Sequence, residues 1–283
     1  MGIFLRHSHL IKPERAQCGS DADVQASIFK NAERIGIDPA SIAVAMPMWG
    51  HGNQQDYIKS NFLTNTGANF SGNCLSFNGS NYLTFPSTPI TQVNSISVFM
   101  RVKFTSLAVS PEGNSQRLLN LAIDGGNLCC LGQDEAGAGG AIFFSIRDSD
   151  VARGRQTPQS SVQINKWHNI MVTRGIGEYA KIYIDGVQKD NANNVFSIGS
   201  EILVGAKTTL SGFSYCCMDN LIVYSQVFPT NTINILNDNP NVLFQRNAPV
   251  FYSLPGGAII PTPRNLAGVA YSDHIVWTWE AGV

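Results

Sequence analysis

The 283-residue sequence is poor in charge: only 14% of its residues are Asp, Glu, Lys or Arg, and 19 basic residues are balanced by 20 acidic ones. A protein that binds nucleic-acid phosphates gathers Lys and Arg on one surface. This sequence contains no such basic segment, so we expect no nucleic-acid partner. It also lacks any run of about 18 apolar residues, which a membrane-spanning helix needs, and we expect no membrane insertion.

Glutamate is scarce as well, which argues against a glycoside hydrolase. The seven glutamates are at positions 14, 33, 112, 135, 178, 201 and 280. A retaining glycosidase holds two carboxyl groups about 5 Å apart, yet none of these residues lies two positions from an Asp within a predicted strand. Because a Gly-x-Ser-x-Gly nucleophile motif is also missing, we predict that the protein is not an enzyme.

The six cysteines fit neither a disulfide framework nor a zinc motif. They are Cys18, Cys74 and two adjacent pairs, Cys129-Cys130 and Cys216-Cys217. Adjacent cysteines rarely bridge each other, and the spacings match no metal-binding pattern. The first nine residues are too short and too polar for the core of a secretion signal. We therefore expect free thiols in a protein that folds in a cytosol.

The middle of the chain has the periodicity of β-strands. Residues 95–104 alternate, so that Ile96, Val98, Met100, Val102 and Phe104 share one predicted core face, and we expect the other face to be largely solvated. Asp185-Gly186 lies between two short β-type segments and predicts a two-residue hairpin turn with positive φ. Short strands separated by Gly and Asn clusters predict an antiparallel β-sandwich.

Two short helices are predicted beside this β region. Ser20 to Asp23 has the sequence of a capping box, and Gly36 is placed to end the helix that follows. This helix is amphipathic and short, so it must pack on its own sandwich or on a neighbouring subunit. Thr230 is expected to cap the second helix, which ends before Asn237.

The last twenty residues contain two further predicted strands, which resemble the start of a fibronectin type III module. They are too few to close a core of their own, and a lone pair of strands is only marginally stable. We therefore expect this hairpin to dock on the sandwich or on another subunit. The predicted organisation is an arm and helix (1–40), a sandwich (41–236), and a linker with the strand pair (237–283).

Five segments together resemble a laminin-G-like, concanavalin A-like jelly-roll domain. They are, in this order, Leu75–Phe85, Asn94–Phe104, Trp167–Thr173, Lys181–Val187 and Gly212–Tyr224. The resemblance implies an all-β fold: an antiparallel jelly-roll β-sandwich (concanavalin A-like) with an N-terminal arm plus short helix and a C-terminal β-hairpin extension.

The segments beside the jelly-roll match resemble those of tailed-phage proteins that carry this domain. Residues 43–77 follow the phage order of a strand, a Gly/Asn-rich loop and a Leu-x-Phe-x-Gly-Ser motif, although 51–56 departs from the usual acidic loop. Residues 239–244 resemble the Asn-Pro-x-x-Leu-Phe segment that follows the phage sandwich.

This resemblance implies a phage virion structural protein: a head decoration, fibre or tail-associated subunit that serves adhesion or particle stabilisation. It would be assembled in the host cytoplasm and located on the virion. Its partners would be other virion proteins, further copies of itself, with a trimer as one option, and a host-surface glycan. The alternatives are a free glycan-binding, lectin-like protein and, third, a glycoside hydrolase.

Candidate site residues follow from the same resemblance and from residue chemistry. Exposed aromatics bind sugars, although aromatics in a sandwich more often fill its core; the candidates are Trp49, Tyr57, Tyr82 and Tyr215. No cofactor is expected; for the alternative of a calcium ion at the sandwich rim, the resemblance implies Asn78, Asn81 and Asp219 as ligands. His168 is expected to be structural. The candidate assembly contacts are Phe29, Phe244, Trp277 and Trp279.

Overall fold

The computed structural model describes residues 21–48, 55–71, 74–90, 95–107, 116–122, 128–134, 139–148, 151–190, 192–193, 202–207, 211–245, 264–270 and 275–280. The chain divides into two compact units, Met1–Arg246 and Asn247–Val283. The larger unit contains the sandwich and the helices, and the smaller one contains a strand pair.

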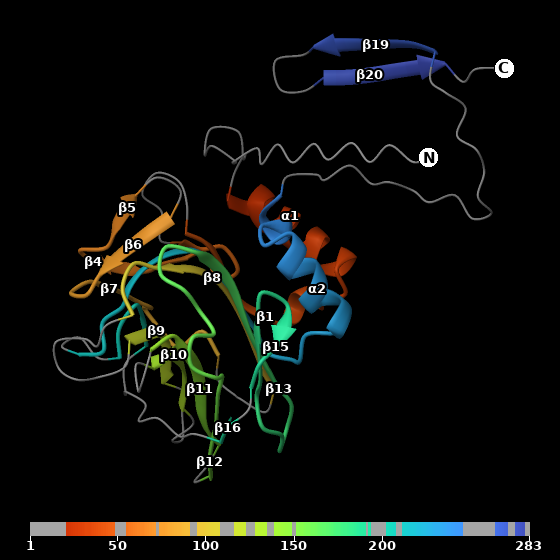
Figure 1. Cartoon of the computed structure of the whole chain (residues 1–283). Coiled ribbons are helices and arrows are strands. Elements are labelled where there is room, and N and C mark those ends of the chain that lie inside the picture. The colour runs from red at the N-terminus through yellow and green to blue at the C-terminus, as the bar shows by residue number, and fades with distance from the viewer. Residues whose placement is uncertain are drawn as a thin grey trace. The chain divides into compact units, whose positions relative to one another are not determined.

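Two antiparallel sheets of eight strands form the larger unit (Figure 1). The first sheet has the order β15 (Val187–Gln188), β14 (Lys181–Ile184), β13 (Trp167–Arg174), β8 (Ile96–Phe104), β18 (Tyr215–Tyr224), β6 (Cys74–Asn78) and β5 (Asn69–Ser71), and β1 (Ile42–Pro47) pairs with β18. The second has the order β16 (Ala192–Asn193), β12 (Val151–Gln156), β11 (Ala141–Asp148), β10 (Leu128–Asp134), β9 (Gln116–Ala122), β17 (Leu203–Val204), β7 (Tyr82–Thr84) and β4 (Thr64–Thr66). A small pair, β2 (Gln55–Asp56) and β3 (Asn61–Phe62), lies outside both sheets. The predicted antiparallel sandwich is confirmed.

The main core lies between the two sheets and is filled by alternate residues of their strands. On β8 these are the five apolar residues that the period-two pattern predicted, and all five are fully buried. They pack with Leu75 and Phe77 of β6 and with Phe144 of β11. Because successive side chains of a strand point to opposite faces, the intervening residues of β8 face away from this core.

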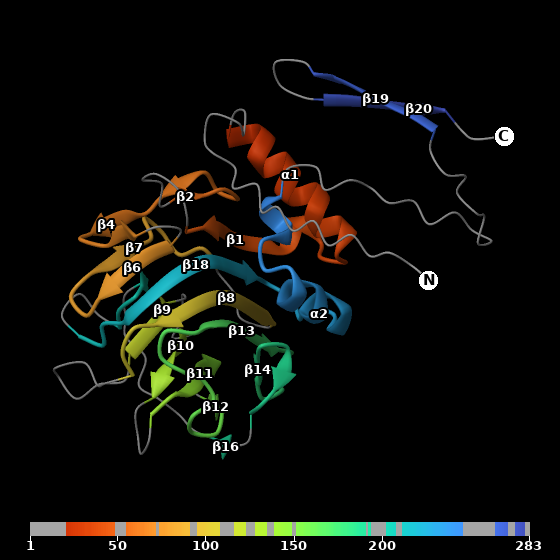
Figure 2. The same ribbon diagram turned by 45° about the horizontal axis from the view of Figure 1, so that its top comes forward.

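A second core covers part of the outer face of the first sheet. Helices α1 (Asp21–Arg34) and α2 (Thr230–Asp238) and the short 3-10 helix η4 (Val242–Phe244) pack there and form the helix layer. Figure 2 shows the first sheet lying between these helices and strands β9 to β12. Phe99 of β8 and Ser97 are completely buried on this side, so the expectation of a largely solvated face was wrong for this half of β8. The helices, which lie far from β8 in the sequence, exclude the solvent.

Hydrogen bonds between distant segments hold the helix layer together. Asn31 of α1 donates to the backbone oxygens of Leu243 (3.2 Å) and Gln245 (2.7 Å). Thr232 of α2 donates to the oxygen of Ile35 at 2.6 Å. The first helix therefore packs on its own sandwich, which is one of the two predicted alternatives.

The predicted C-terminal end of α1 is correct, the Ser20 of its predicted capping box lies outside the described residues, and the predicted ends of α2 are wrong. Helix α1 ends at Arg34, and Gly36 follows with a φ of +80°. Helix α2 begins at Thr230 itself, and Pro229 occupies the N-cap position without a side-chain hydrogen bond. Proline has no side-chain group that could accept the capping hydrogen bond, and the helix continues to Asp238.

Two predicted hairpins are present. Asp185 (φ +52°) and Gly186 (φ +79°) link β14 to β15 with the positive φ that this turn requires. In the smaller unit, β19 (Arg264–Ala270) pairs with β20 (Ile275–Glu280). A further short 3-10 helix, η2 (Pro39–Ser41), precedes β1. Among the described residues, no helix is long and apolar enough to span a membrane.

Candidate functional site

Three half-buried aromatic residues surround the turn between β6 and β7, and we call them the aromatic rim. Tyr82 begins β7, Tyr215 begins β18, and Phe213 lies two residues before β18. The ring centroids of Tyr82 and Phe213 are 6.2 Å apart, with the planes tilted by 33°. Because β18 pairs with β6 through Tyr215 and Asn78, residues distant in the sequence meet at this end of the sandwich.

Gly79 places the Tyr215 ring against the turn. It has a φ of +85°, which favours glycine, and a Cβ at this position would overlap the Tyr215 ring. The Gly79 N–H donates to the oxygen of Ser214 at 2.9 Å. Gln116 of the second sheet accepts from the Tyr215 N–H at 2.9 Å. The ring is therefore positioned from both sheets.

Two amides shape the turn beside the rim. Asn81, which is buried, accepts from the Asn78 N–H (3.0 Å) and donates to the oxygen of Gly67 (3.0 Å). Asn78 is exposed and accepts from the N–H and hydroxyl of Ser80. Aromatic faces beside an exposed amide and hydroxyl are suited to the alternating apolar and hydroxylated faces of a sugar.

The structure thus brings together two of the four aromatic residues predicted to bind a glycan. Tyr57 instead packs against the helix layer, and Trp49 lies outside the described residues. Phe213 was missed, although it stands two positions before Tyr215 and so has the spacing of a side chain on the same face of an extended segment.

The three residues predicted to bind calcium do not converge. Asn78 and Asn81 belong to one turn, whereas Asp219 lies four residues along β18 from the partner of Asn78, about 13 Å at the usual strand rise. Asp219 forms an ion pair with Arg101 at 2.6 Å. Within the described part of the chain, no group of three or more His, Cys, Asp and Glu is placed to hold a metal ion. These three residues therefore form no shared calcium site.

The predicted assembly residues divide between the two units. Phe244 is 7% exposed and fills the helix layer of its own chain. Phe29 packs against the same cluster. Trp277 and Trp279 are in β20, and their side chains lie outside the described structure. Both phenylalanines therefore contribute to packing within the chain, and their contact with a neighbouring subunit stays a prediction.

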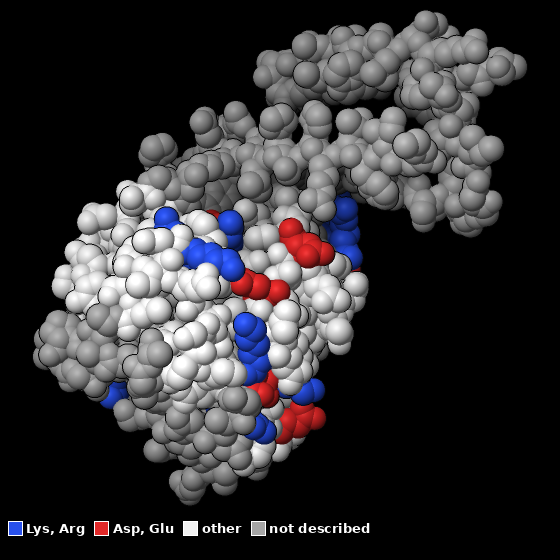
Figure 3. Space-filling model, in the orientation of Figure 1, with Lys and Arg blue, Asp and Glu red and all other residues white. Residues whose placement is uncertain are grey.

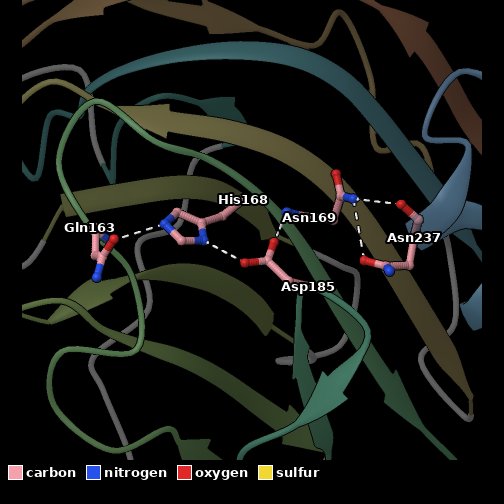
Figure 4. A network of polar contacts seen from close by, with 5 residues as sticks. All are labelled: Gln163, His168, Asn169, Asp185 and Asn237. Atoms are coloured by element: carbon pink, nitrogen blue, oxygen red, sulfur yellow. Dashed lines mark hydrogen bonds and ion pairs between the residues drawn. The ribbon is translucent and has the colours of Figure 1, made fainter.

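A polar network connects the β13 strand to the turn at Asp185 and to helix α2 (Figure 4). His168 Nδ1 is 2.9 Å from a carboxylate oxygen of Asp185, and its Nε2 accepts from the Gln163 N–H at 3.0 Å. The other Asp185 oxygen accepts from the Asn169 N–H at 2.9 Å, and the Asn169 amide donates to the oxygen of Asn237. Since both ring nitrogens of His168 have protein partners, this histidine is structural.

This network predicts a defined dependence of stability on pH. Burial raises the pKa of Asp185, but the hydrogen bonds from His168 and Asn169 outweigh it, so the net pKa is lowered. A carboxyl with a lowered pKa contributes stability above its unfolded pKa, near 4, and loses it as the pH falls through the folded value. We expect Asp185→Asn to lower the free energy of unfolding at pH 7, and the difference from wild type to be smaller at pH 3, where the carboxyl begins to protonate.

Urea unfolding at both pH values measures this effect. The exposed Glu33→Gln serves as the control and should change neither value. A difference between Asp185→Asn and wild type that is the same at pH 7 and pH 3 would contradict the role of the carboxylate.

Charged side chains are sparse on the face drawn in Figure 3. Lys, Arg, Asp and Glu occupy a band through its middle, and much of the remaining described surface is uncharged. A ligand recognised mainly by charge would find few partners there, whereas a neutral hydroxylated ligand requires none.

Comparison with known proteins identifies the family. A model of a laminin-G-like family described as the concanavalin A-like lectin/glucanases superfamily matches residues 77–234, which is more than half of the chain. The chain belongs to this superfamily. A search of curated proteins found no match.

Solved structures of the same fold come from proteins with different activities. A mutant Trypanosoma rangeli sialidase that displays trans-sialidase activity is 14% identical, with a TM-score of 0.52. The match covers 80% of this chain and 39% of the sialidase chain. The receptor-binding domain of botulinum neurotoxin C/D mosaic serotype is 15% identical, with a TM-score of 0.52, and covers 70% and 51%.

A third similar structure is a single domain, and almost all of it aligns with this chain. Domain 4 of AbnA, a GH43 extracellular arabinanase from Geobacillus stearothermophilus in complex with arabinotriose, is 16% identical, with a TM-score of 0.50, and covers 72% of this chain and 98% of its own. The chain therefore spans two fifths of the sialidase and half of the toxin domain, but almost all of the arabinanase domain. At these identities the similarity establishes the fold.

Proposed function

We propose that this protein is a structural protein of a tailed-phage particle that displays its sandwich as a non-catalytic, glycan-binding adhesion module. The observation that carries the proposal is the separation of the aromatic rim from the helix layer along β18. Its first residue, Tyr215, belongs to the aromatic rim, and its last, Tyr224, is buried in the helix layer. Nine residue steps separate them, about 30 Å. Of the two segments that resemble phage proteins, residues 239–244 contribute Leu243 and Phe244 to the helix layer, whereas residues 43–77 run from the Tyr224 end of β18 to its rim end.

Glycan binding is supported by the rim and by the fold. Half-buried rings with an amide and a hydroxyl beside them provide stacking and hydrogen bonds to a sugar. Among the proteins of this fold are a toxin receptor-binding domain and an arabinanase domain that was solved with arabinotriose. The proposed ligand is a neutral glycan of a host surface.

The positions of the described glutamates favour glycan binding over glycan hydrolysis. Of the seven glutamates, Glu33 and Glu178 are described with their side chains; both are exposed and belong to different elements. Neither is placed beside a second carboxylate at the rim. Release of reducing ends from bacterial polysaccharides by the purified protein would contradict the proposal.

Quantitative mass spectrometry of purified particles tests the virion role. A high copy number per particle would indicate a head decoration, and a low one a fibre or a tail component. Absence from clean particles would overturn the virion role and leave the free lectin as the alternative, which the rim alone supports.

A glycan array tests the rim. We expect Tyr215→Ala and Tyr82→Ala to lose at least about tenfold in apparent affinity, because each removes a stacking surface worth more than about 1.4 kcal/mol. Tyr179→Ala is the matched control, since Tyr179 is exposed in the loop after β13. Binding of all three variants at wild-type strength would exclude the rim as the binding site.

A further inference from the structure

Four side chains form a row across the outer face of the first sheet. Ser76 of β6 is opposite Cys217 of β18, Cys217 is opposite Lys103 of β8, and Lys103 is opposite Trp167 of β13. The neighbours of Cys217 in β18, Cys216 and Met218, belong to the main core, so Cys217 points away from it. The row is thus on the same face as the helix layer but is not part of that cluster.

A second thiol lies beside this row. Cys74 begins β6, two positions before Ser76, and therefore faces the same side of the sheet. The thiols of Cys74 and Cys217 are hydrogen-bonded to each other. The Cys74 Sγ also lies 3.3 Å from the oxygen of Ser71. The exposed fractions are 4% for Cys74 and 7% for Cys217, against 0% for Cys216 and Cys130.

The surroundings of the two thiols shift their pKa values in opposite directions. The hydrogen bond from Cys74 lowers the pKa of Cys217 to about 6, against the effect of burial and with further lowering by Lys103 and Ser76. The same hydrogen bond raises the pKa of Cys74. Burial raises the pKa of Cys216 and of Cys130. Cys217 is therefore the more readily deprotonated thiol of the pair, and the thiolate is the nucleophilic form.

We propose that Cys217 and Cys74 form a dithiol site that reacts with small-molecule disulfides, with Cys217 as the nucleophile and Cys74 as the resolving thiol. The Cys217 thiolate attacks one sulfur of the disulfide, forms a mixed disulfide and releases the first small thiolate. Cys74 then loses its proton and attacks the sulfur of Cys217, which releases the second small thiolate. The two protein thiols are oxidised by two electrons, and the small disulfide is reduced to two thiols.

Closing the bridge requires a small movement of β6. Cys74 is diagonal to Cys217 in the pairing of β6 with β18, and diagonal neighbours start farther apart than the 3.5–4.5 Å between Cβ atoms that a disulfide needs. Oxidation would draw the Cys74 end of β6 toward β18. The other end of β6 carries the turn at Gly79, so the site and the rim share a strand.

The first test is the pH dependence of alkylation of the full chain by iodoacetamide. We expect Cys217 to react with a midpoint clearly below the value of about 8.5 for a free thiol. Lys103→Gln and Cys74→Ala should raise this midpoint, whereas Cys74→Ser retains a hydrogen-bond donor and should change it least. A midpoint near that of a free thiol, or modification of Cys216 or Cys130 in preference to Cys217, would overturn the proposal.

The second test separates the nucleophile from the resolving thiol. The full chain is incubated with oxidised glutathione and mapped by peptide mass spectrometry without reduction. Wild type should contain a Cys74–Cys217 bridge without an adduct, Cys74→Ser should retain glutathione on Cys217, and Cys217→Ser should contain neither. A stable adduct on Cys217 of the wild type, or no modification at all, contradicts the assignment.

Discussion

Replacement of Gly205 by alanine is expected to destabilise the protein by about 2–6 kcal/mol. Gly205 has a φ of +86°, and a Cβ at this position would overlap the ring of Phe77. Phe77 is 1% exposed and belongs to the main core, so it has no room to move away. The expected cost is the sum of a left-handed backbone at a non-glycine residue, about 1–3 kcal/mol, and overpacking of a dense core, about 1–3 kcal/mol.

Gly177→Ala is the matched control for this substitution. Gly177 also has a positive φ, +71°, but a Cβ at this position would have no neighbouring atom within 4 Å. Its substitution should cost only the backbone component, about 1–3 kcal/mol. Urea unfolding followed by circular dichroism gives both values. Equal destabilisation by the two substitutions would mean that the contact with Phe77 is not a constraint.

Phe99→Ala is expected to cost about 3–5 kcal/mol, the usual range for removal of a buried phenylalanine. Phe99 is fully buried between the first sheet and the helix layer, with Met171 and Ile222 beside it. The substitution leaves a cavity beneath the helices rather than in the main core. We therefore expect faster hydrogen exchange in α1 and α2 than in β13 or β18.

An exposed phenylalanine provides the comparison. Phe62 is 56% exposed, and Phe62→Ala should change the free energy of unfolding by about 0.5 kcal/mol or less. If Phe99→Ala has as small an effect, or accelerates exchange equally throughout the sandwich, then the helix layer is not a separately stabilised part of the unit.

The sandwich could be predicted because the patterns that indicate it involve residues close together in the sequence. The alternation in β8 and the Asp185-Gly186 turn are determined by strand geometry and by the φ values that a tight hairpin needs. The outer face of β8 was predicted incorrectly for the opposite reason. Phe99 is covered by helices more than sixty residues away in the sequence, and no periodicity within β8 can reveal what will pack on it.

The candidate site was predicted only in part. Tyr82 and Tyr215 could be selected as aromatics near turns, but their neighbourhood depends on the pairing of Asn78 with Tyr215 across β6 and β18. The same pairing separates Asp219 from Asn78, so these two residues cannot be ligands of one calcium ion. Cys74 and Cys217 were expected to be independent buried thiols, and only the register of these two strands makes them neighbours.

The arrangement of β18 has a mechanical consequence. Helix α1 and η4 contact each other through Asn31; Tyr224, the last residue of β18, is buried in the same helix layer, and the aromatic rim lies where β18 begins. If a ligand holds the rim while the segments beside the helices are anchored, the tension between them would run along β18. Its hydrogen bonds to β6 and β8 would then be loaded in shear, all at once, rather than opened one after another. The module would resist detachment best under tension in that direction.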